Sequence, residues 1–358
     1  MEKIIRNFWI EILLFIGFIV ISCLYFFNIR ELIVLFFQDQ TPEYFNEFAY
    51  QFYPRLLVDK QRFEADFFLA KADQVLFRLG FCLFLGLIFS YFYKQKNAFQ
   101  KYIKTFFSLK ISVLYAKKMR IAFVLAVFFM TYSWHGNLLA MLNYSIFYQP
   151  ISFLEFFQVP FPNVWQIHVI FGIYCLSLLC ILLNIKTLYA SVSLAILFEL
   201  MHAYMLSFEK IDHGYVTLSY VILLFPFFVF QIQNAENEGF KTWALPLIRL
   251  VLALVYLLSG LEKVFSSGTD WISADVFRNY LLLYQNPFGL WVAESDFLCQ
   301  FLPICTIFFQ LGFVSILFYR PLRFIFLPFG VLFHTGTYLL FGFGYPINAW
   351  ILMYIFFL

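Results

Sequence analysis

Charged residues are scarce in this chain. Asp, Glu, Lys and Arg make up only 13% of its 358 residues, whereas 63% are hydrophobic and 54 are phenylalanine. A water-soluble domain could not hide so much apolar surface in its core. The scarcity of charge therefore excludes a soluble protein and predicts an integral membrane protein.

Other missing features narrow the kind of membrane protein further. The first apolar run, after Lys3 and Arg6, has spanning length and no small-residue cleavage site, so we interpret it as a retained helix. The six cysteines form no Cys-x-x-Cys pair. The sequence does not decide whether Cys299 and Cys305 form a disulfide. No internal repeat of the kind found in many transporters is visible. The net charge of +3 gives no reason to expect a nucleic-acid partner, because topology separates basic from acidic residues.

What the sequence does contain is a series of long apolar runs. A run of about 20 apolar residues can cross a membrane as a helix, which satisfies its own backbone hydrogen bonds there. We therefore predict an all-α fold, a polytopic transmembrane helix bundle of about nine or ten membrane helices plus interfacial helices. The predicted spans are 8–29, 75–93, 120–143, 164–183, 187–206, 214–232, 245–264, 301–318 and 323–343. The apolar tail 349–358 is too short to cross unaided, so we expect a truncated or re-entrant helix.

Basic residues gather in alternate connections. The segment 94–120 contains many lysines and no acid, whereas the predicted loop 39–73 is rich in acids. Because cytoplasmic loops carry the excess of Lys and Arg, we predict that 94–120 and the N-terminus are cytoplasmic. Aromatic residues at helical spacing against lysines predict an interfacial helix over 98–117. Residues 1–118 are expected to form an N-terminal two-helix membrane unit with this basic interfacial helix.

Ionisable side chains in the predicted helices gather at one depth. Such residues are costly in a membrane, so their gathering predicts an outward-facing cavity. Glu199 lies one helical turn from His202, which resembles half of a di-metal site, but no second Glu-x-x-His string accompanies it, and we predict no metal site. We interpret His135 and His168 as ordinary interfacial or core residues. The residues placed toward the outer side are His135, His168, His202, His213, His334 and Lys263.

Lys263 ends an almost unbroken apolar run that begins at Trp243. A lysine in such a position commonly extends its ammonium toward water, and this alternative stays open. The small pair Ser259-Gly260 lies one turn earlier, and small residues let a second helix approach closely. We therefore expect the amine to face protein, where a partly desolvated lysine can act as a base.

Three short strings that contain His213, Lys263 and His334 follow one another along the chain. They are Asp212-His213-Gly214-Tyr215, then Gly260-Leu261-Glu262-Lys263 followed by Asp270-Trp271, and then Phe333-His334. Upstream, Lys118-Met119-Arg120 opens a predicted helix. This ordered set resembles the HTTM family, the membrane domain shared with vitamin K-dependent γ-glutamyl carboxylase. The resemblance covers roughly residues 119–345, so residues 119–358 are expected to form an HTTM-like membrane domain.

The resemblance implies roles for individual residues. Lys263 corresponds to the base that deprotonates a reduced quinone, and His213 corresponds to a histidine of the same active site. His334 becomes a third catalytic candidate. Trp271 and Tyr215 become candidates for binding the cofactor, which would be reduced menaquinone or another isoprenoid quinone.

Two departures from the carboxylase shape the functional expectation. Glu262 stands where the carboxylase has a lysine, and the stretch from Lys263 to Asp270 is longer. Short bacterial members of the family include the membrane component that helps mature the sporulation-delaying toxin. We therefore expect a bacterial cytoplasmic (inner) membrane protein, either a carboxylase-like enzyme or a peptide- or protein-maturation enzyme with an outward-facing lysine-base site.

The alternative is a non-catalytic membrane scaffold, or a partner subunit of a secretion or maturation complex. Its aromatic outer segments, 40–73 and 145–163, would bind a peptide or protein partner on the extracytoplasmic side. An aromatic belt in contact with membrane lipids explains the same composition, so the sequence leaves both functions open.

Overall fold

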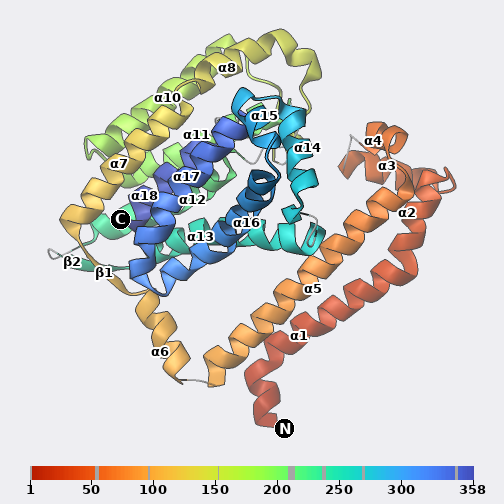
Figure 1. The fold of residues 1–358 in the computed structure, drawn as a ribbon, viewed down its shortest axis with the longest axis horizontal. Coiled ribbons are helices and arrows are strands. Elements are labelled where there is room, and N and C mark those ends of the chain that lie inside the picture. The colour runs from red at the N-terminus through yellow and green to blue at the C-terminus, as the bar shows by residue number, and fades with distance from the viewer. Residues whose placement is uncertain are drawn as a thin grey trace. The chain divides into compact units, whose positions relative to one another are not determined.

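The computed structural model describes most of the chain (Figure 1). The described residues are 2–52, 56–95, 97–151, 153–208, 214–235, 239–267, 271–342 and 346–358. The chain divides into two compact units, Met1–Ile103 and Lys104–Leu358. The boundary that the family resemblance places between residues 118 and 119 stays a prediction.

The fold is all-α, as predicted, and has the composition of a polytopic membrane protein. Among the described residues, eight helices are long and apolar enough to cross a membrane. Each of them overlaps one of the predicted spans. They are Trp9–Phe37, Ala65–Lys94, Val164–Leu182, Thr187–Leu206, Val216–Gln233, Ala244–Phe265, Asp296–Leu317 and Arg320–Phe341.

The predicted span 120–143 is not a single helix. Helix α7 (Val113–Thr131) ends in the middle of this segment, and α8 (Trp134–Met141) begins after a short break. Helix α7 also begins earlier than predicted, because the side chain of Ser112 caps it by accepting a backbone hydrogen bond. The cations of residues 117–120 therefore lie in the first turns of α7 and not before it.

The N-terminal unit is a helical hairpin with short helices at its turn. Near one end, Lys94 donates to Glu11 at 2.5 Å. Farther along, Tyr25 donates to Asp73 at 2.6 Å, so the first helix runs antiparallel to the fifth. The elements are α1 (Glu2–Leu24), the π-helical turn η1 (Tyr25–Ile29), α2 (Arg30–Phe37), α3 (Glu43–Phe52), α4 (Leu56–Arg62), α5 (Ala65–Gln95) and α6 (Asn97–Phe106), which extends past the unit's boundary.

The interfacial helix predicted over 98–117 is shorter than expected. Helix α6 ends at Phe106, and the chain then forms strand β1 (Leu109–Ser112). This strand pairs antiparallel with β2 (Gly239–Thr242), which places Lys110 opposite Lys241. A local sequence pattern could not reveal this pairing, because the partner strand lies far along the chain.

The remaining helices of the C-terminal unit pack against one another as a bundle. Consecutive long helices from α10 to α13 contact one another, α13 contacts α16, and α18 packs on both α17 and α7 (Figure 1). The elements after α8 are η2 (Leu142–Phe147), α9 (Phe153–Phe156), α10 (Val164–Leu182), α11 (Thr187–Leu206), α12 (Val216–Gln233), α13 (Ala244–Ser267), α14 (Ala274–Tyr284), α15 (Pro287–Ala293), α16 (Asp296–Gly312), η4 (Phe313–Leu317), η5 (Arg320–Leu322), α17 (Arg323–Phe341) and α18 (Pro346–Phe357).

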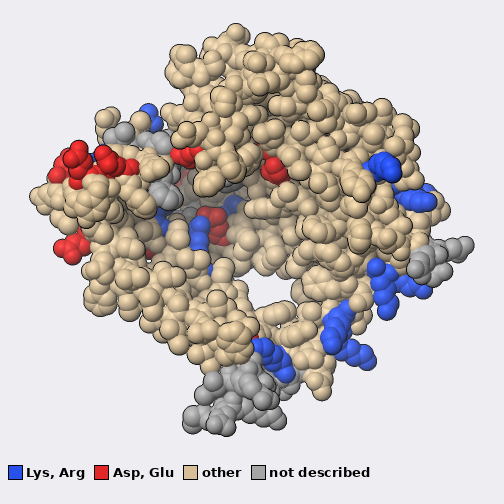
Figure 2. All heavy atoms as spheres, turned by 180° about the vertical axis from the view of Figure 1, so that it is seen from behind, with Lys and Arg blue, Asp and Glu red and all other residues tan. Residues whose placement is uncertain are grey.

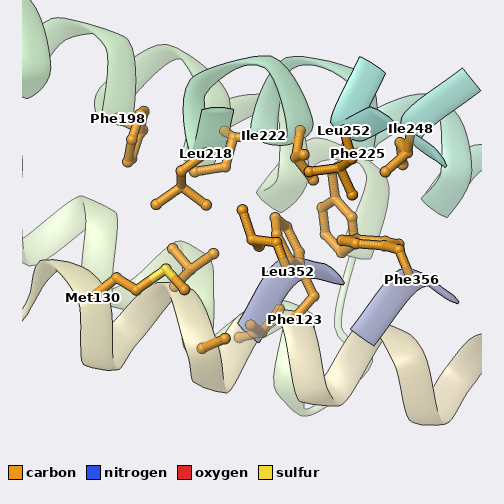
Figure 3. Close-up of a cluster of buried hydrophobic side chains, with 14 of the residues drawn as sticks. Phe123, Met130, Phe198, Leu218, Ile222, Phe225, Ile248, Leu252, Leu352 and Phe356 are labelled. Atoms are coloured by element: carbon orange, nitrogen blue, oxygen red, sulfur yellow. The ribbon is translucent and has the colours of Figure 1, made fainter. Parts of the chain in front are cut away.

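The core of this unit lies where α7, α11, α12, α13 and α18 meet (Figure 3). Phe123 of α7 packs its ring on Phe225 of α12 at 4.5 Å and on Phe356 of α18 at 5.4 Å. The short C-terminal helix α18 is thus part of the core. Its contacts with the other helices stabilise it, although it is too short to cross a membrane by itself. Arg249 donates to the backbone oxygen of Phe356 at 2.6 Å and so binds a carbonyl at the end of α18.

Positive charge gathers at one end of the C-terminal unit, which we call the basic end. Here β1 leads into α7, β2 leads toward α13, and Arg120 of α7 donates to Asn184 in the turn between α10 and α11 at 2.5 Å. Figure 2 shows lysine and arginine atoms along this border of the unit. The described cations of the basic end are Lys110, Lys117, Lys118, Arg120, Lys186, Lys241, Arg249, Arg320 and Arg323.

Candidate functional site

A polar stripe runs along one face of the apolar helix α13. Tyr256, Ser259, Gly260 and Lys263 follow the spacing i, i+3, i+4, i+7, which places them on the same side of a helix. This side faces α16 and α17, since Gln310 of α16 contacts Ser259 and His334 of α17 contacts Tyr256.

Gly260 lets α16 approach α13 closely. A Cβ atom at this position would lie 2.8 Å from Cδ2 of Leu311 and 3.0 Å from Cβ of Gln310. Real Cβ atoms essentially never make a contact as short as 2.8 Å, so any residue larger than glycine here requires the Leu311 side chain or the helices to shift. The close approach predicted from the Ser259-Gly260 pair is therefore confirmed.

Lys263 contacts neutral groups of the protein. Its Nζ donates to Oγ of Ser259 at 3.0 Å and lies 5.2 Å from the ring centre of Trp271. Gln310 donates its side-chain N–H to the same serine oxygen at 3.2 Å. We call Lys263, Ser259, Gln310 and Trp271 the lysine site. No ion pair joins Lys263 to an acid within the part of the chain that the structure describes.

Two buried polar atoms of the lysine site have no hydrogen-bond partner among the described residues. One is the acceptor Oε1 of Gln310, a residue that is 5% exposed, and the other is the donor Nε1 of Trp271. Buried polar atoms are nearly always paired, and an exception commonly marks the place of a water or a ligand. The lysine site thus offers one unused acceptor and one unused donor beside the amine.

The short helix α14 packs against Trp271. The indole ring packs on Tyr280 of α14 at 5.9 Å. Helix α14 is tied to its neighbours by Arg278, which bonds to Asp296 at the start of α16 and to the backbone oxygen of Ala293 at 2.9 Å. The hydrogen bond that Arg278 donates to Asp296 also raises the pKa of the Arg278 guanidinium above its usual range.

His334 lies deeper along the same stripe and does not contact Lys263. Its Nε2 is 2.8 Å from the hydroxyl oxygen of Tyr256, and both side chains are buried. Tyr256 precedes Lys263 by seven residues, or about 10 Å along the helix axis. The Nδ1 of His334 is buried, and no partner for it occurs in the described part of the chain. The structure thus brings Lys263 together with Trp271 but leaves His334 two turns away.

The other residues of the predicted site lie elsewhere or are not described. His213 lies outside the described residues, so its predicted convergence with Lys263 stays a prediction. Tyr215 donates to the backbone oxygen of Met130 at 3.3 Å and packs on Trp134 at 5.0 Å, in a cluster of α7, α8 and α12. Its predicted role in binding a cofactor stays a prediction.

The Glu199-x-x-His202 string does not form a shared polar contact in the structure. Ser219 donates a hydrogen bond to the carboxylate of Glu199, whereas the ring of His202 stacks on Trp134 at 5.9 Å. No group of three or more His, Cys, Asp or Glu side chains able to hold a metal ion occurs among the described residues.

Two polar contacts were not predicted from the sequence. His135 and His168 are hydrogen-bonded at 2.9 Å, from α8 to α10, although each was interpreted as an ordinary residue. Gln310 was not singled out, yet a lone amide within the apolar run 301–318 is a detectable signal of an interhelical hydrogen bond. All six cysteines are free, so the disulfide between Cys299 and Cys305 is not formed.

Comparison of the chain with protein-family models, with curated proteins and with solved structures found no match. The functional argument therefore rests on the residues of the lysine site and on their contacts.

Proposed function

We propose that this protein is a membrane enzyme in which Lys263 accepts a proton from the hydroxyl group of an isoprenoid hydroquinone. The observation that carries the proposal is the lysine site itself. Among the described residues, the amine donates to a serine hydroxyl and lies over an indole ring, beside two buried polar atoms for which no described partner occurs. The family resemblance to the HTTM proteins supports the same residue.

The contacts of Lys263 suit a base. A carboxylate partner would hold the amine as an ammonium ion, whereas a hydroxyl and an indole ring stabilise that ion less. The hydroxyl of Ser259 fixes the position of Nζ, and Gln310 fixes the hydroxyl in turn. An amine so positioned can take up a proton from a bound weak acid and release it again.

The unpaired atoms fit a hydroquinone. Its two hydroxyl groups each donate and accept hydrogen bonds, so Oε1 of Gln310 would accept one and Nε1 of Trp271 would donate one. The indole ring of Trp271 adds a flat apolar surface for an aromatic ring. When bound, the hydroquinone would supply the reducing chemistry, and reduced menaquinone is the form expected in a bacterial membrane.

The proposal includes an orientation in the membrane. If the basic end faces the cytoplasm, the lysine site lies toward the outer side, because Lys263 is near the far end of α13. The predicted N-terminus is then cytoplasmic, in the bacterial inner membrane. Membrane-impermeant maleimide added to intact cells should label Ser267→Cys and not Ser108→Cys. The reverse pattern would contradict both the orientation and the outward-facing site.

A scaffold that binds a peptide or protein partner is the second candidate function. Large apolar side chains of η2 and α9 are highly exposed, among them Ile146 of η2 at 85% and Phe156 of α9 at 81%. Exposed apolar patches of this kind mark interaction sites or contact with lipid. The test of the lysine site separates this function from the enzyme.

The test uses purified protein in lipid nanodiscs with 2-methyl-1,4-naphthohydroquinone as the probe, under argon. Binding is measured by quenching of tryptophan fluorescence, and the ionised fraction of the probe is read from its absorption spectrum. We expect the wild type to bind and ionise the probe, and Lys263→Ala and Lys263→Arg to bind it without ionising it. A guanidinium keeps its proton and cannot act as the base.

The control is Lys118→Ala, which removes an exposed lysine at the basic end and should behave as the wild type. Equal ionisation by Lys263→Arg and the wild type would show that only positive charge is required. The enzyme proposal would then be wrong, and the scaffold would become the better function.

A further inference from the structure

A groove on the outer surface of the C-terminal unit is lined almost entirely by apolar side chains. Its volume is about 480 Å³, which lies in the range of ligand sites, roughly 300–1,000 Å³. Helices α11 and α12 form its walls, and Phe153 of α9 contributes to its lining. The residues lining it are Phe153, Val192, Ala195, Ile196, Glu199, Leu200, Leu223, Pro226 and Phe227.

The groove opens toward the surroundings of the two helices and not toward the core. Val192, Ile196, Leu223 and Phe227 are between 42% and 62% exposed. Both helices are long and apolar enough to cross a membrane. Exposed apolar side chains on such helices contact lipid, so an acyl chain can enter this groove from the side.

Glu199 is the one charged residue of the lining. Its Oε1 accepts a hydrogen bond from Ser219, and no partner of its other oxygen occurs among the described residues. A carboxylate in an apolar wall is costly unless donors or a cation meet both of its oxygens, and Ser219 meets only one of them. The lining contains no lysine or arginine that could fill this role.

The carboxylate lies near the end of the helices at which a lipid headgroup would be found. Its partner Ser219 is only three residues from Val216, the start of α12, or about 5 Å along the axis. The groove therefore combines an apolar surface for a chain with a negative charge near the membrane surface.

We propose that this groove binds a phospholipid with a primary ammonium headgroup, of the phosphatidylethanolamine type, with the ammonium donating to Glu199. Charge complementarity selects this occupant. A phosphatidylglycerol brings only negative charge to a carboxylate, and the quaternary ammonium of a phosphatidylcholine has no N–H to donate. The proposal is independent of the lysine site, because none of the residues of that site line this groove.

The experiment is native mass spectrometry of the full chain released from detergent, titrated with three lipids that carry the same acyl chains. We expect the phosphatidylethanolamine adduct to form with an apparent dissociation constant about tenfold lower than those of the phosphatidylcholine and phosphatidylglycerol adducts. Glu199→Gln should remove this preference, whereas Glu294→Gln, at an exposed glutamate outside the groove, should keep it.

A second pair of variants tests the groove itself. Val192→Trp fills the groove and should lower binding of phosphatidylethanolamine, whereas Leu176→Trp adds the same bulk on α10, outside the lining, and should not. Equal affinity for the three lipids, or an unchanged preference in Glu199→Gln, would overturn the proposal. So would normal binding by Val192→Trp.

Discussion

The two units of the chain use similar apolar helices in different ways. In the two membrane-length segments of the N-terminal hairpin, 6% and 0% of the residues are buried. In those of the C-terminal unit, the buried share of residues is 28% to 44%. The hairpin therefore buries few side chains, and polar contacts form a visible part of what joins its helices. The C-terminal bundle buries more of each helix by packing.

The polar contacts of the two units show the same difference. In the hairpin, Lys94 pairs with Glu11, and Arg30 and Asp73 lie 3.6 Å apart, so each cation meets an acid. In the lysine site, Lys263 meets a hydroxyl and an indole ring. A paired charge stabilises a structure and a charge with neutral partners can react, which is why the second arrangement suggests a function.

The largest expected effect is on the lysine site. Lys263→Ala should reduce the protein's activity, measured as the rate at which it ionises the hydroquinone probe, at least 100-fold. Loss of a general base costs about 10²–10⁴ in rate. Melting temperature in detergent, measured by intrinsic fluorescence, should change little. The matched variant Lys94→Ala removes the paired lysine of the hairpin and should keep this activity. A loss of activity in Lys94→Ala as large as in Lys263→Ala would abolish the distinction between the two lysines.

The next largest effect should come from Gly260. Gly260→Ala places a Cβ atom 2.8 Å from Cδ2 of Leu311 and 3.0 Å from Cβ of Gln310, so the Leu311 side chain or the two helices must shift, at a cost of about 1–3 kcal/mol. Gly86→Ala in the hairpin meets nothing within 4 Å and should be neutral or stabilising, because alanine favours the helix. The measurement is the midpoint of thermal unfolding for each variant in the same detergent. A neutral Gly260→Ala would contradict the close packing of the two helices.

A smaller effect is expected at the buried pair on the same stripe. Tyr256→Phe leaves the Nε2 of His334 without a partner in the core, which should cost about 1–3 kcal/mol. In a double-mutant cycle with His334→Leu, the two changes should therefore not be additive, since the second removes the unpaired group. Additive changes in the free energy of unfolding would show that the tyrosine and the histidine do not interact.

The smallest effect should be the ion pair of the hairpin. Side chains of Lys94 and Glu11 are 32% and 14% exposed, and partly exposed pairs contribute about 0.2–1 kcal/mol. Glu11→Gln should therefore lower the unfolding midpoint slightly, and the loss should shrink at high salt. A large loss that salt does not affect would mean that the hairpin is held by burial, like the bundle.

Much of the fold could be predicted from local patterns. Long apolar runs predicted each of the eight helices of membrane length, and the small pair Ser259-Gly260 predicted the close approach of a second helix, which is α16. The break between α7 and α8 was missed, because both sides of it are apolar. The pairing of β1 with β2 was missed as well, because it joins segments that are remote in sequence.

The sequence by itself determined that this is a polytopic helical membrane protein, since only helices can satisfy the backbone of such apolar segments in lipid. It also determined that Lys263 shares a helix face with Ser259 and Tyr256, because that follows from helical spacing. Only the tertiary structure decided what this face meets. Gln310 and His334 meet this face because α13 packs against α16 and α17, and Trp271 meets it from the connection between α13 and α14.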